Sequence, residues 1–233
     1  MTTHLEHEIL ERPDFAMLCV KLATGQKVFT EPAAMASMDE TIGLHAGLRG
    51  GLLGGVGRMF AGESLIMNTF TAERGAGEVM LAPGPAGDIV HHRLRGGRFM
   101  LSRGAFLASS EGVTLSAKWE GARGFFSGNG LVLLQALGEG DLFFNAYGAV
   151  LELPVDGEYL VDTGYVVAFE DTLNYQVTTL PGLGVGSKVK SFLFGGEGLV
   201  VRFAGQGRLW VQTRTVNPFL SWVHPYRPVK KRE

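Results

Sequence analysis

A short glycine-led pattern occurs three times in this chain, and it constrains the fold more than any other sequence feature. Each copy runs into an apolar strand, then a Gly-x-Gly pair, then a second strand-like stretch. The copies begin with Gly62–Met67, Gly128–Leu133 and Gly196–Val201. The glycine pairs lie at 75–77, 138–140 and 205–207. Glycine between two apolar stretches is typical of turns, so the pattern predicts three hairpins.

A second repeated unit precedes each hairpin unit. It begins at Gly25, Gly97 and Gly157, continues into a strand, and reaches a Pro or Gly seven residues later, before another strand. Together the two units predict three copies of one module. We place the copies at about 9–82, 83–146 and 147–215, in one domain that covers 1–215, followed by an aromatic and basic tail at 216–233.

The composition favours an all-β fold. Glycine accounts for 34 of 233 residues, and it interrupts every stretch that could show the 3.6-residue periodicity of a helix. Strand repeats cannot bury one face alone, so neighbouring copies must cover each other. We therefore predict an antiparallel sandwich of three internal repeats, with sheets packed around a pseudo-threefold axis. The net charge of −2 argues against a dedicated nucleic-acid binder.

Known catalytic and cofactor motifs do not fit this sequence. Gly182–Lys188 lacks the glycine before the lysine that a phosphate-binding loop requires, and Val189 stands where Ser or Thr should be. No Cys/His set has zinc spacing, and no serine lies in a Gly-x-Ser-x-Gly elbow. We expect no enzyme activity, no cofactor and no metal. The single cysteine, Cys19, lies in an apolar run and should be a buried, inert thiol.

Two groups of residues are candidates for binding. His91, Arg93 and Arg95 alternate, so on a strand they share one face, and Arg98 follows closely. This face is either simply solvated or a contact for phosphate groups of RNA or acidic lipid. The second group is apolar. It comprises loop leucines and tail aromatics, which either cover the core or contact a membrane or a subunit: Leu48, Leu52, Leu53, Phe219, Trp222 and Tyr226.

The tail ends in Lys230-Lys231-Arg232, which suits an anionic membrane interface beside the aromatics. The sequence has no basic and apolar leader at its start, and no apolar run near the roughly 18 residues of a membrane span. We therefore expect a cytoplasmic protein that meets a membrane only at its surface.

Several stretches, in order along the chain, resemble the altered inheritance of mitochondria protein 24 family, in particular its bacterial members. The matching stretches are distributed over roughly residues 9–215 and are Gly62–Leu65, Pro83–Val90, Arg103–Ser109, Asn145–Ala149, Val161–Glu170 and Val211–Arg214. The resemblance implies a fold like that of the tryptophan-RNA-binding attenuation protein, a β-sandwich related to the double-stranded β-helix and repeated internally. It supplies no catalytic residues. Mitochondrial relatives are associated with inner-membrane organisation.

The leading functional hypothesis is a non-enzymatic oligomeric scaffold or binding protein that acts at a membrane surface or on a protein assembly. Exposed apolar loops on three similar modules favour self-association, with a trimer as the first expectation. Two alternatives stay open. One is an RNA-binding module that uses the Arg93 and Arg95 face. The other is a small-molecule binder or enzyme with a pocket between repeats.

Overall fold

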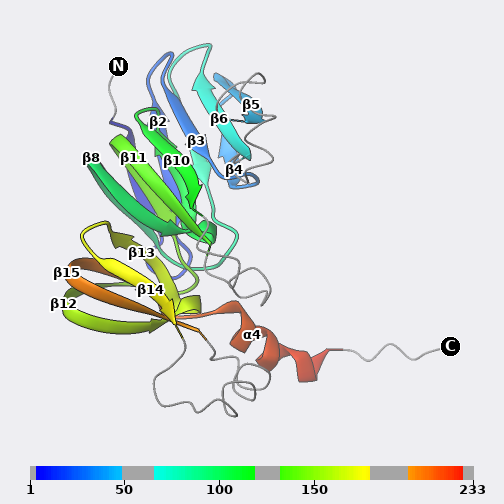
Figure 1. The fold of residues 1–233 in the computed structure, drawn as a ribbon. Coiled ribbons are helices and arrows are strands. Elements are labelled where there is room, and N and C mark those ends of the chain that lie inside the picture. Colours follow the sequence, from blue (N-terminus) through cyan, green and yellow to red (C-terminus); the bar gives the residue numbers. More distant parts are fainter. Residues whose placement is uncertain (1–3, 49–65, 119–131, 179–198, 228–233) are drawn as a thin grey trace.

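The structure is a computed structural model, and it describes residues 4–48, 66–118, 132–178 and 199–227. These residues form antiparallel strands with little helix, which confirms the all-β prediction (Figure 1). The first part of the chain contains β1 (Glu6–Leu10), β2 (Met17–Leu22), β3 (Lys27–Thr30), β4 (Met35–Met38), β5 (Ile42–Leu48), β6 (Ile66–Ala72) and β7 (Gly77–Leu81).

The rest of the chain uses longer strands. The middle part contains β8 (Ile89–Ser102), β9 (Phe106–Ser110), β10 (Val113–Lys118) and β11 (Leu133–Asn145), with the 3₁₀ turn η1 (Arg103–Ala105) between β8 and β9. The last part contains β12 (Val150–Asp162), η2 (Thr163–Tyr165), β13 (Val166–Glu170), β14 (Asn174–Thr178) and β15 (Val200–Gln212). The order of elements from β8 to β11 is therefore the same as from β12 to β15.

The strands form two sheets. The smaller has the order β1-β2-β7-β4, and the larger runs β12-β15-β13-β8-β11-β9-β3-β6-β5, with β10 beside β11 and β14 beside β15. The larger sheet has two ends among the described strands and is not closed. Long strands such as β11 change partners along their length: β11 pairs with β10 at one end and β9 at the other, with β8 along its whole length. The two antiparallel sheets fit the predicted β-sandwich.

Two of the three predicted glycine turns are wrong. Gly138 and Gly205 lie inside the continuous strands β11 and β15, where φ is +107° and +122°. At Gly138 the register of β11 against β8 shifts, so this glycine forms a β-bulge. Only Gly75, between β6 and β7, lies at a break in a strand. A positive φ suits both a turn and a bulge, and the sequence pattern is the same for both.

The described residues form a core of three apolar clusters, each of which draws on more than one third of the chain. The first centres on Phe70, the second on Phe99 and Trp210, and the third on Phe169 and Phe203. Cys19 lies beside the first cluster. Burial and the hydrogen bond that its thiol donates to Glu78 raise the pKa of Cys19 to about 11, as expected for an inert thiol.

The tail contains a helix that the sequence analysis did not predict. Helix α4 (Val216–Val223) is followed by the turn η3 (His224–Tyr226). Pro218 lies in the first turn of α4, where its missing N–H costs no helical hydrogen bond. In Figure 1 the helix projects away from the sheets.

Candidate functional site

Helix α4 and turn η3 expose an unusual number of large apolar side chains. Trp222 is 65% exposed and Tyr226 is 76% exposed, while Val216, Phe219 and Leu220 are between 44% and 55% exposed. No residue of α4 is buried. A helix this short is not stable from its own hydrogen bonds, so it needs something to pack against.

A chain of ring contacts joins this helix to the sheets. Tyr147, at the start of the last third of the chain, meets Phe219 with ring centroids 6.0 Å apart. Phe219 then meets Trp222 at 6.2 Å, and Trp222 meets Tyr226 at 6.0 Å. The first contact anchors the helix, and the later rings extend outward from it. We define Phe219, Leu220, Trp222 and Tyr226 as the aromatic patch.

The predicted basic face on β8 has a different role for two of its members. His91 Nε2 lies 2.8 Å from Asp141 Oδ1, and Arg93 Nη1 lies 3.0 Å from the same oxygen. Asp141 is fully buried, and its other oxygen accepts a hydrogen bond from the Leu5 N–H and lies 3.1 Å from His4 Nδ1. Arg93 therefore supplies a counter-charge to a buried carboxylate, and His91 lies within hydrogen-bond distance of the same oxygen.

The pKa of Asp141 follows from this surrounding. Burial by itself raises the pKa of this carboxyl group, since it disfavours the charged form. The hydrogen bonds from His91, the Leu5 N–H and Arg93 outweigh burial and hold the pKa well below its usual range. Asp141 is therefore ionised at neutral pH, and it links β8 and β11 to Leu5, the residue just before β1.

All four members of the predicted face line an open groove of about 710 Å³ between β8, the end of β13 and β15. Arg98 Nε donates to Asp171 at 2.7 Å. Arg95 is exposed in the groove wall. His92 stacks on Phe99 with ring centroids 4.1 Å apart. Burial, together with the nearby charge of Arg208, lowers the pKa of His92 to about 4. The imidazole of His92 is therefore neutral at physiological pH.

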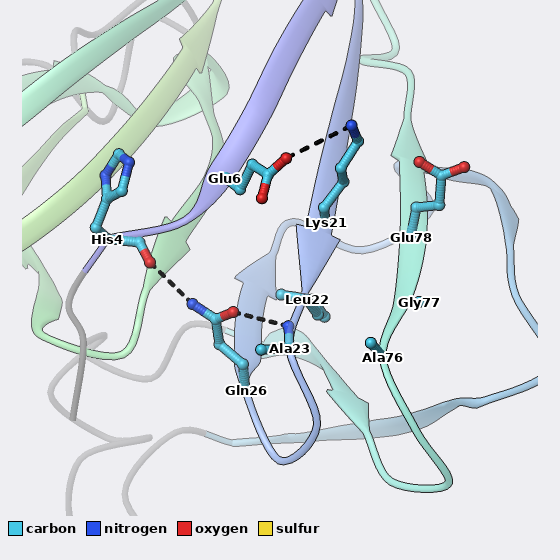
Figure 2. A pocket seen from close by; sticks show the side chains of 9 residues that line it. All are labelled: His4, Glu6, Lys21, Leu22, Ala23, Gln26, Ala76, Gly77 and Glu78. Carbon is cyan, nitrogen blue, oxygen red and sulfur yellow. Dashed lines mark hydrogen bonds and ion pairs between the residues drawn. The ribbon is translucent and has the colours of Figure 1, made fainter.

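A second open depression, of about 610 Å³, lies beside β2 and the turn before β7 (Figure 2). The polar groups in its wall bond to one another. Gln26 donates to the His4 carbonyl at 2.8 Å and accepts from the Ala23 N–H at 3.0 Å, while Lys21 lies 3.5 Å from Glu6. These polar groups do not converge on a common point where a ligand would bind.

Some predicted contact residues cannot be placed. Leu52 and Leu53 lie outside the described residues, and so does the side chain of Leu48 at the end of β5. The glycines that begin the three repeated motifs, Gly62, Gly128 and Gly196, also lie outside them. Within the described residues, no group of three or more His, Cys, Asp or Glu side chains could hold a metal ion. No helix among them is long and apolar enough to cross a bilayer.

Comparison with known proteins places the chain in a family. The model of the mitochondrial biogenesis AIM24 family matches residues 7–214. An uncharacterised protein of Streptococcus pyogenes serotype M6 is 27% identical over 226 residues, which cover 92% of this chain and 88% of the relative. The X-ray structure of a Streptococcus pyogenes protein has a TM-score of 0.79 at 27% identity, covering 96% of this chain and 100% of that one. The chain therefore belongs to the mitochondrial biogenesis AIM24 family.

Proposed function

We propose that this protein is a non-enzymatic, oligomeric scaffold that attaches to an anionic membrane surface through α4. The observation that carries the proposal is the aromatic patch, which leaves Trp222 and Tyr226 mostly exposed. Aromatic side chains favour the headgroup region of a bilayer. In the sequence, Lys230-Lys231-Arg232 begins four residues after Tyr226, so the apolar and basic parts of the tail are close together.

Both parts of the tail contribute modestly to membrane affinity. An apolar side chain such as Leu220 contributes about 1.5–3 kcal/mol when it is fully buried. A basic residue near an anionic surface adds about 1 kcal/mol. One copy of the tail therefore gives weak, reversible attachment, and several copies on one assembly multiply it. Self-association is for this reason part of the proposal.

The charged cluster supports a structural role for the body of the protein. Asp141 is fully buried and bound to β8 and to Leu5, so it cannot contact a substrate. We also propose that the three thirds of the chain are copies of one module, because their element order and sheet registers agree. The pseudo-threefold arrangement stays a prediction.

Vesicle co-sedimentation tests the membrane attachment. The protein is mixed at low salt with vesicles that contain cardiolipin, and separately with vesicles of zwitterionic lipid. We expect pelleting with the anionic vesicles, and at least a tenfold weaker partition for Leu220→Ala combined with Trp222→Ala, because each replacement removes exposed apolar surface.

The matched control is Phe15→Ala. Phe15 is 73% exposed but belongs to the segment between β1 and β2, so its loss should leave vesicle binding unchanged. Absence of pelleting with cardiolipin vesicles at low salt would remove the membrane attachment. An equal loss in the Phe15 variant would show that binding is merely nonspecific adhesion.

A further inference from the structure

Three short strands occupy the same place in the three thirds of the chain. They are β4, β9 and β13. Each forms a bulge against one partner strand, which we call its inner partner: β7 for β4, β11 for β9 and β15 for β13. The register shifts at Met35/Ser37, Phe143/Phe144 and Val166/Ala168. β9 and β13 also have an outer partner. β9 pairs with β3, and β13 pairs with β8. Among the described strands, β4 pairs with β7 alone.

Burial follows this difference in pairing. Every residue of β9 is buried, and so are the first four residues of β13. Every residue of β4 is exposed, including Met35 at 37% and Met38 at 38%. β4 thus presents an apolar strand edge that its two counterparts cover with a neighbouring strand, and an uncovered edge of this kind is a template for β-pairing.

The complementary edge lies on β12. In the other two thirds of the chain, the corresponding strands are β8, which pairs with β13, and β3, which pairs with β9. Among the described strands, β12 pairs with β15 alone. Phe99 and Met100 on β8 are each 1% exposed. Their counterparts on β12 are Tyr159 and Leu160, which are 46% and 41% exposed. The accepting edge of β12 is therefore unpaired among the described strands.

The core clusters show the same gap. The first cluster includes Leu107 and Ala108 from β9, and the second includes Val167 and Ala168 from β13. Each of these clusters is thus completed by the short strand of the following third of the chain. The third cluster contains Val166 and Phe169 from β13 of its own third, but among the described residues no short strand of a following module completes it.

We propose that the missing strand is β4 of a second copy of this chain, which pairs antiparallel with β12. The inference rests on the oligomeric scaffold proposed above and names its interface. Figure 1 shows β4 and β12 at opposite ends of the molecule, so the pairing joins separate copies head to tail.

The two junctions inside the chain fix the register. Thr30 lies opposite Ala108, and Leu101 lies opposite Ala168. Val161 on β12 corresponds to Leu101 on β8, because the two residues come four positions after Gly157 and Gly97. Ser37 on β4 corresponds to Ala168 on β13, because each is the first paired residue after the bulge. The interface therefore pairs Val161 with Ser37 and Leu160 with Met38. The second pair buries the exposed apolar residues of both edges.

A charge difference distinguishes this junction from the internal ones. In the junction between β8 and β13, Met100 lies opposite Phe169. Two positions further along the same two strands, Arg98 Nε donates a hydrogen bond to Asp171 at 2.7 Å. The corresponding positions of the β3–β9 junction hold Lys27 and Glu111. Between copies, the same positions hold Glu158 and Glu40. Like charges directly opposite weaken strand pairing, so this junction is weaker than its internal counterparts and reversible.

Charge exchange at this pair is the test, with self-association measured by sedimentation over a concentration series without lipid. Glu158→Arg restores the arrangement of Arg98 and Asp171 and should lower the dissociation constant between copies about three- to tenfold. Glu40→Arg should do the same. The double variant, with two arginines opposite each other, should return to the weak association of the natural chain.

Leu160→Lys should abolish association at concentrations where the natural chain assembles. Two controls match these changes: Leu151→Lys, which is on β12 and 50% exposed but outside the pairing register, and the exposed Asp14→Arg, which is on neither edge. Both should associate as the natural chain does. A monomer at all concentrations for every variant, or single and double charge variants that behave alike, would overturn the pairing.

Failure of this interface and failure of membrane attachment are separable. Loss of association in Leu160→Lys with vesicle binding still dependent on Trp222 would support the interface and retain the membrane proposal. If none of the β12 and β4 variants changes the dissociation constant between copies, while vesicle binding is intact, the interface alone would be rejected.

Discussion

Asp141 shows how one buried charge can hold distant parts of this chain together. The carboxylate binds His91 and Arg93 from the neighbouring strand and the backbone of Leu5 near the N-terminus. Ser110 Oγ accepts a hydrogen bond from the Asp141 N–H at 2.9 Å. A buried charge with this many partners is costly to disturb, because removing one partner leaves the others buried and uncompensated.

Asp141→Asn should lower the free energy of unfolding by about 3–5 kcal/mol at pH 7, because Arg93 loses its buried counter-charge. Urea denaturation followed by circular dichroism measures this. Asp171→Asn removes a surface partner of Arg98 and should cost less than about 1 kcal/mol. Equal losses in the two variants would contradict the assignment of Asp141 as a buried anchor.

The lowered pKa of Asp141 also sets a pH dependence. A carboxyl group whose pKa is depressed in the folded state stabilises the fold above its unfolded pKa, near 3.9, and that stabilisation is lost as pH falls toward the folded pKa. The natural chain should therefore lose stability steeply below about pH 4. The Asp141→Asn variant should show a shallower loss there, measured by denaturation at pH 7, 4 and 3.

The sequence contained part of this cluster. The alternation of His91 and Arg93 correctly predicted that both lie on one face of a strand. It did not show that Asp141 lies directly across from Arg93, because strand register is set by contacts far apart in sequence. A lone aspartate beside Leu142 and Phe143 was the available signal, since an unpaired carboxylate would not fit such an apolar strand.

At the scale of elements, the glycines in the long strands bend the sheets. Gly138 combines a φ of +107° with the backbone of Gly112 directly where a side chain would lie. Gly138→Ala should therefore cost about 1–3 kcal/mol of stability. Gly97→Ala is the matched control, because Gly97 has open space at that position and no positive φ. Thermal unfolding compares the two, and similar melting temperatures would contradict the bulge assignment.

Element types were more predictable than the connections between them. Apolar alternation and glycine spacing identified strands along the chain, but a glycine inside β11 and one between β6 and β7 have the same sequence context. Helix α4 was missed because Phe219, Trp222 and Tyr226 indicated an anchor without indicating its conformation. Helices this short carry little periodicity to detect.

For the whole molecule, assembly and membrane attachment should reinforce each other. The Glu158→Arg variant, which we expect to associate more tightly, presents more tails on each particle. It should therefore reach half-maximal vesicle binding at a lower protein concentration than the natural chain, measured by co-sedimentation with cardiolipin vesicles. Unchanged vesicle binding despite tighter association would show that the tails of one assembly do not face the same surface.

The junctions between thirds of the chain also determine the order in which the protein can be completed during synthesis. The first core cluster needs Leu107 and Ala108, and the second needs Val167 and Ala168, so each waits for a strand that the ribosome makes later. Leu5 emerges among the first residues, yet its partner Asp141 follows 136 positions later. The nascent chain therefore carries an unfinished core edge throughout translation, and a chaperone that covers strand edges would meet its substrate there.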